Sequence, residues 1–89
     1  MAKRNPKRAA ELNIAGLEHF VNWQLEDAVA HFEKAIAADE SNPEYHLNLA
    51  RVLARSGRYD DAMTALGGYL SKETETEIAA RFERLFTTA

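Results

Sequence analysis

Three histidines are the side chains of this sequence best suited to metal binding or proton transfer. His19 and His46 fall on the apolar stripes of predicted helices, so we interpret them as core histidines that bond to neighbouring groups. His31 is expected near solvent, where helical spacing pairs it with Asp27 or Ala35, and that pair makes no metal site. The sequence contains neither Glu-x-x-His nor His-Glu-x-x-His. The histidines therefore predict no metal centre.

The remaining chemical signals are equally weak. The chain has 0 cysteines, which excludes a thiolate ligand, a disulfide and a cysteine nucleophile. Gly67-Gly68 lies inside a helical pattern, with no strand before it and no Lys-Ser/Thr after it, so it is not a phosphate-binding loop. Carboxylates gather at helix starts and on polar faces, their usual solvated position. We expect no catalytic residue, no metal, no cofactor and no enzymatic activity.

Charge is distributed unevenly along the 89 residues. Residues 1–8 hold four of the 11 basic side chains. Residues 9–89, the body of the chain, hold the other seven basic side chains and all 14 acidic ones, so the body has a net charge of −7. A basic arm can bind nucleic acid, but an acidic body repels a polyanion. We interpret the arm as a solvated terminus and expect no nucleic-acid partner. No apolar run is long enough for a membrane segment or a signal peptide, so a cytoplasmic location is expected.

Helix signals recur along the whole chain, and no strand pattern is present. Asn5-Pro6 and Asn42-Pro43 each combine an N-cap residue with proline at the first helical position. Asn22 is expected to end the first helix in the left-handed conformation, and Ser56-Gly57 ends the third. The predicted helices are about five in number, over residues 6–22, 25–38, 43–56, 59–70 and 74–88. The predicted fold class is all-α.

The helical pattern repeats once at an offset of 34 residues, from residues 9–42 to residues 43–76. Leu25-Glu26-Asp27-Ala28 corresponds to Tyr59-Asp60-Asp61-Ala62, in which Asp27/Asp61 and Ala28/Ala62 are identical. A period of this length marks a stacked array, whose units bury their apolar faces against their neighbours. Such arrays usually present a surface to other molecules.

The repeated residues resemble the tetratricopeptide repeat, a family of helix–turn–helix units. The residues that carry the resemblance are Leu12, Ala15-Gly16, His19, Ala28, Phe32 and Ala35 in the first unit, and His46, Leu49-Ala50, Leu53, Gly57, Tyr59, Ala62 and Leu66 in the second. The resemblance implies a right-handed superhelical stack of antiparallel helix pairs in a single domain. Its parts would be a partly helical arm at 1–8, repeats at 9–42 and 43–76, and a capping helix at 74–88.

Trp23 departs from the family pattern, which has glycine at this position. The turn must then use Asn22 or a different geometry. Two interpretations of Trp23 stay open: an exposed anchor for a partner, or a turn residue folded back onto the second helix.

In this family the first helix of each repeat lines a concave groove. The resemblance places eight residues there: Asn13, Ile14, Leu17, Val21, Leu47, Asn48, Arg51 and Arg55. An apolar strip beside two arginines suits a peptide whose carboxylate is flanked by apolar side chains. The family's chaperone-binding groove needs further basic residues that are missing here, so that partner is not expected.

The predicted function is therefore a non-catalytic module that binds a partner peptide or protein. The alternative is a structural domain that self-associates as a homodimer through its apolar helix faces. Two repeats and a cap are few for a stable array, which favours either this alternative or origin from a longer protein.

Overall fold

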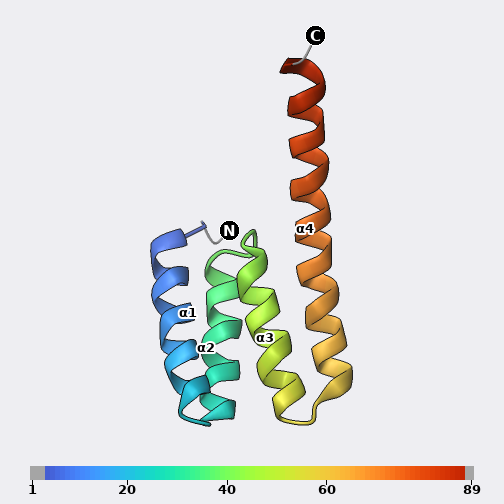
Figure 1. The fold of residues 1–89 in the computed structure, drawn as a ribbon. Helices are drawn as coiled ribbons and strands as arrows, with labels where there is room; N and C mark the ends of the chain where they lie inside the picture. Colours follow the sequence, from blue (N-terminus) through green and yellow to red (C-terminus); the bar gives the residue numbers. More distant parts are fainter. Residues whose placement is uncertain (1–3, 88–89) are drawn as a thin grey trace.

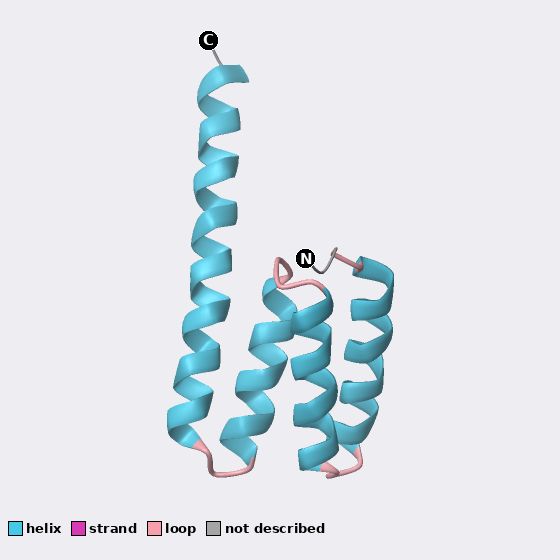
Figure 2. Cartoon of the chain, turned by 180° about the vertical axis from the view of Figure 1, so that it is seen from behind, coloured by secondary structure: helices cyan, strands magenta, loops and turns pink. Residues whose placement is uncertain are grey.

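Over residues 4–87 the chain forms four helices arranged as two antiparallel pairs. The structure is a computed structural model that describes residues 4–87, apart from the side chains of residues 72–76, 78–79 and 81–87. The helices are α1 (Pro6–Val21), α2 (Leu25–Ala38), α3 (Pro43–Arg55) and α4 (Tyr59–Thr87), shown in Figure 1. Over the described residues the chain contains helices and loops but no strand (Figure 2). The all-α prediction is confirmed.

Both Asn-Pro signals begin helices as predicted. The Asn5 side chain accepts a hydrogen bond of 3.1 Å from the backbone N–H of Arg8, at the start of α1. The Asn42 side chain accepts one of 2.9 Å from the backbone N–H of Glu44, at the start of α3. Each cap satisfies a backbone donor that has no partner within the helix.

Helix α4 differs from the prediction, because it is one helix of 29 residues where two were expected. The segment between Leu70 and Thr74 contains no proline, and continuing a helix forms one more hydrogen bond per residue. Ending one helix and starting another would leave backbone groups at both ends to be satisfied. Up to residue 87, the predicted cap 74–88 is thus the C-terminal part of α4. Its role as a cap stays a prediction, and most of its side chains lie outside the described residues.

Consecutive helices pack side by side, and over the described residues α4 packs against α3 and not against α1 or α2. Figure 1 shows that the C-terminal part of α4 extends beyond the other three helices. The side chains of Ala28 and Phe32 are fully buried between the helices, together with Val52. Ala28, a position at which the repeat has the same small residue twice, is part of this core. Ala9, Leu12, Ala35 and Tyr45 form a second, smaller buried cluster.

Gly16 sets the distance between α1 and α2. A Cβ atom at this position would lie 2.5 Å from Cε1 of Phe32, closer than carbon atoms can approach. The Phe32 ring therefore packs directly on the α1 backbone.

Candidate functional site

The apolar strip predicted on α1 lies at the surface. Ile14 is 57% exposed, Leu17 38% and Val21 76%. Their spacing puts all three on one face of the helix, away from the buried Leu12. A contiguous exposed apolar strip is unusual on a small protein and is typical of an interaction surface.

Asn48 lies beneath this surface and does not line it. It is 3% exposed, and its Nδ2 donates a hydrogen bond of 2.8 Å to Oδ1 of Asn13. Its own Oδ1 accepts a longer contact of 3.5 Å from Arg51. The two amides thus join α1 to α3, and Asn48 also contacts the Arg51 side chain.

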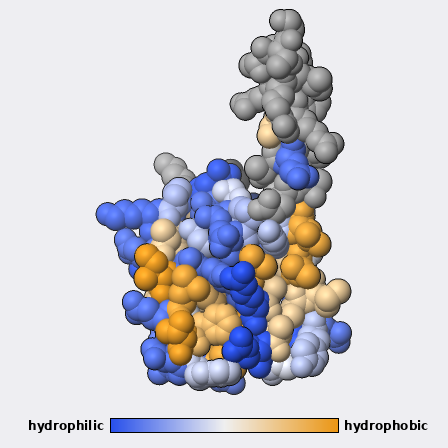
Figure 3. Space-filling model, in the orientation of Figure 1, coloured by the Kyte–Doolittle hydropathy of each residue, from blue (hydrophilic) through white to orange (hydrophobic). Residues whose placement is uncertain are grey.

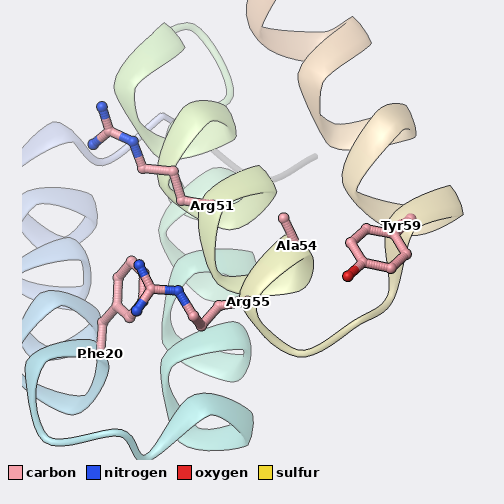
Figure 4. A pocket seen from close by; sticks show the side chains of 5 residues that line it. All are labelled: Phe20, Arg51, Ala54, Arg55 and Tyr59. Carbon is pink, nitrogen blue, oxygen red and sulfur yellow. The ribbon is translucent and has the colours of Figure 1, made fainter.

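Arg51 and Arg55 line a cavity of about 660 Å³ together with Phe20, Ala54 and Tyr59 (Figure 4). They are one helical turn apart on α3, so their positive charges face the same side. Figure 4 shows the Arg55 side chain reaching from α3 toward the Phe20 ring on α1. These two of the eight predicted residues therefore meet at one opening.

No described carboxylate pairs with either arginine. The ion pairs among the described side chains join Arg4 to Asp39, Arg8 to Glu11 and Arg58 to Asp61. Two like charges one turn apart repel each other mildly, so an anion between them would stabilise both. In Figure 3 a hydrophilic band runs over α3, between apolar patches over α1 and α4. The surface thus combines positive charge with flanking apolar area.

Trp23 belongs to this site, although it was not among the eight predicted residues. The Arg55 guanidinium carbon lies 5.0 Å from the centroid of the Trp23 ring and 5.5 Å from that of Phe20. Both distances are within the range of cation–π attraction. Phe20, Val21, Trp23 and Arg55 line an adjoining cavity of about 330 Å³. Trp23 is 67% exposed, so its ring is not buried on α2.

The turn after α1 takes its left-handed residue at Trp23, with φ of 60°, whereas Asn22 has φ of −93°. The expectation that Asn22 would adopt this conformation is therefore wrong. The turn needs its positive φ one residue past the C-cap, where the N–H of Gln24 reaches the carbonyl of His19 at 2.9 Å. The turn requires a positive φ at position 23 whichever residue stands there.

Leu47 lies in a second opening, between α3 and α4. This groove of about 330 Å³ is lined mainly by apolar side chains, among them Ala50, Ala62, Met63 and Leu66. Arg51 borders both openings. Of the eight predicted residues, Arg51 and Arg55 meet at one opening, and Val21 lines the adjoining cavity with Arg55. Ile14 and Leu17 are exposed on α1, and Asn13 and Asn48 bond to each other between α1 and α3.

Each histidine bonds to a neighbouring group. Nδ1 of His19 lies 2.8 Å from Oε1 of Gln24, and Nε2 of His46 lies 3.1 Å from the Glu40 carbonyl oxygen. The rings of His19 and His31 pack with their centroids 4.7 Å apart, a contact that the sequence did not indicate. Within the described part of the chain, no cluster of three or more His, Cys, Asp or Glu residues could hold a metal ion.

Comparisons with known proteins agree with the repeated pattern. A family model described as the tetratricopeptide repeat matches residues 24–82, well over half of the chain. No curated protein and no solved structure matches. Among the described residues, no helix is long and apolar enough to cross a membrane.

Proposed function

Because the chain belongs to the tetratricopeptide repeat family, whose members generally mediate protein–protein interactions, we propose that it binds an acidic–apolar peptide on the face shared by α1 and α3. Members of this family are typically non-catalytic, and the proposed activity is binding alone. The partner is a protein segment in which a carboxylate is flanked by apolar side chains.

The arginine pair carries this proposal. Arg51 and Arg55 line the same opening and have no carboxylate partner among the described side chains. A guanidinium group binds a carboxylate through two parallel hydrogen bonds, which gives both affinity and orientation. The exposed Ile14, Leu17 and Val21 strip on α1, of which Val21 shares a cavity with Arg55, would supply apolar contact area for the flanking residues.

Charge reversal tests the proposal. Arg51→Glu with Arg55→Glu is expected to abolish binding of a labelled peptide in which one glutamate lies between leucine and phenylalanine. Lys7→Glu with Lys34→Glu is the matched control, because it changes the net charge equally at two exposed positions outside this surface. Fluorescence anisotropy measures the binding, and circular dichroism checks helicity. Undiminished binding by the arginine variant would refute the proposal.

Self-association is a second candidate, favoured by the groove between α3 and α4. An offset of 34 residues maps Tyr59 and Met63 onto Leu25 and Val29 of the first repeat. Val29 is 7% exposed within the main core, whereas Tyr59 is 69% and Met63 68% exposed at the end of the stack. In a dimer, the second copy of the chain would bury Tyr59 and Met63, as α3 packs over the corresponding face of the first repeat.

The mass in solution, measured across a range of concentrations, separates the two candidates. Self-association predicts a dimer that Met63→Glu dissociates, and a chain that stays monomeric throughout would exclude it. Leu17→Glu tests the α1 strip in the same way. A dimer that is lost with Leu17→Glu but kept with Met63→Glu would place the interface on α1.

A further inference from the structure

The turns that follow α1 and α3 have the same geometry but different residues at the left-handed position. After α1, the N–H of Trp23 donates to the carbonyl of Phe20 at 3.0 Å, and Trp23 has φ of 60°. After α3, the N–H of Gly57 donates to the carbonyl of Ala54 at 3.0 Å, and Gly57 has φ of 80°. Glycine adopts this conformation freely, whereas a bulky side chain is strained there.

The fold does not need an indole at position 23. The equivalent turn forms with Gly57, where a Cβ atom would meet no other atom within 4 Å. The Trp23 side chain is 67% exposed, so it contributes little to the core. A strained residue whose ring lies at the surface is typical of a functional position.

The contact of Trp23 is with Arg55. The guanidinium group lies over both the Trp23 and the Phe20 rings, 5.0 and 5.5 Å from their centroids. Cation–π contact with two rings restricts the Arg55 side chain, while its N–H groups can still donate to a planar acceptor. The C-terminal end of α3 carries only about half a negative charge, which the two full charges of Arg51 and Arg55 outweigh.

We infer that Phe20, Trp23 and Arg55 form a subsite for an acidic residue that is followed by an aromatic one. The peptide carboxylate binds the edge of the Arg55 guanidinium group. The adjacent aromatic side chain packs against the exposed face of the Trp23 indole, in the cavity of about 330 Å³ that also contacts Val21. This inference rests on the proposed function and assigns Trp23 the selection of the partner's sequence.

Trp23 is the only tryptophan of the chain, so its fluorescence reports on this subsite directly. The probe is a short acetylated and amidated peptide in which one glutamate lies between leucine and phenylalanine. Control peptides carry glutamine for the glutamate or alanine for the phenylalanine. The probe is expected to change the Trp23 emission at the concentrations at which anisotropy shows it binding. The glutamine peptide should bind at least about tenfold more weakly, because it lacks the charge.

Trp23→Gly separates binding from folding. This variant reproduces the turn at Gly57, so its melting temperature is expected to equal or exceed that of the native chain. Its affinity for the probe should fall about tenfold, and it should no longer distinguish phenylalanine from alanine in the peptide. Trp23→Phe keeps an aromatic ring and should stay within about threefold of native affinity.

Three results would overturn the inference. A clear fall in the melting temperature of Trp23→Gly would make the indole a structural element. Native affinity in Trp23→Gly, with binding still abolished by Arg51→Glu and Arg55→Glu, would remove Trp23 from the site but leave the proposed function standing. Absence of probe binding by the native chain would remove both.

Discussion

The side-chain amide of Asn48 donates a hydrogen bond of 2.8 Å to Oδ1 of Asn13, and this bond joins two helices that are not consecutive in the chain. Asn48 is 3% exposed and Asn13 is half-buried, so the bond is partly shielded from water. The bond lies where α3, which carries the two arginines, meets α1, which carries the apolar strip. The proposed binding face therefore depends on a polar contact beneath it.

Asn48→Ala is expected to lower the free energy of unfolding by about 1–2 kcal/mol, because Asn13 loses its partner in a partly buried site. Combining it with Asn13→Ala should show a coupling energy of about 1 kcal/mol in urea denaturation. Asn22→Ala is the control, because the exposed amide of Asn22 bonds only to the nearby Glu18 carbonyl. Strictly additive effects of the two substitutions would show that the amides are not coupled.

Gly16→Ala is expected to destabilise the protein by about 1–3 kcal/mol, because the new Cβ would lie 2.5 Å from the buried Phe32 ring. Gly67→Ala is its matched control. Gly67 also lies within a helix but has no atom within 4 Å of its Cβ position, so alanine should raise stability by up to about 1 kcal/mol. Thermal denaturation of the two variants measures both effects. A stabilising Gly16→Ala would mean that the α1–α2 contact is looser than described.

Gly68→Ala tests the contact between α3 and α4. Alanine has a higher helix propensity than glycine here, as at Gly67, but the new Cβ would lie 2.8 Å from Nδ1 of His46. The His46 ring is held by the Glu40 carbonyl, 3.1 Å from Nε2. We expect Gly68→Ala to be at least about 1 kcal/mol less stable than Gly67→Ala in the same denaturation assay. Equal stabilities would show that His46 moves aside freely.

Asp39→Ala is expected to cost about 1–2 kcal/mol of stability, because the buried carboxylate accepts hydrogen bonds of 2.6 Å and 3.2 Å from Ser41. Arg4 forms an ion pair with the same carboxylate at 3.4 Å, but its side chain is 64% exposed. Arg4→Ala should therefore change stability by less than about 0.5 kcal/mol. Chemical denaturation of both variants compares the two contributions, and an equal loss would show that the ion pair and not the turn is the stabilising element.

The starts of α1 and α3, and which residues form the core, could be predicted from local sequence. Asn-Pro predicts a helix start because a cap and a preset φ act within one turn of the chain. Ala28 and Phe32 are predicted as core because their spacing repeats with the helical period. The break before Thr74 was wrong, because a capping pattern is a local preference and does not outweigh the hydrogen bonds of a continuing helix.

The candidate site was predictable only in part. Helical spacing on its own put Ile14, Leu17 and Val21 on one exposed face of α1. It could not show that Asn48 is buried, because burial on that side of α3 depends on how closely α1 approaches. The signal for Trp23 was present in the repeat, since it aligns with Gly57, but its contact with Arg55 was not visible in the sequence.

By itself, the sequence determined the repeat, the helix starts and the arginine pair on one face of α3, since these depend on residues a few positions apart. The tertiary structure alone decided that Arg55 lies over Trp23 and that Asn48 bonds to Asn13. Both contacts join α1, or the turn after it, to α3 across more than 30 residues of chain. Their geometry follows from helix packing distances, which close contacts such as Gly16 on Phe32 set and which no local pattern encodes.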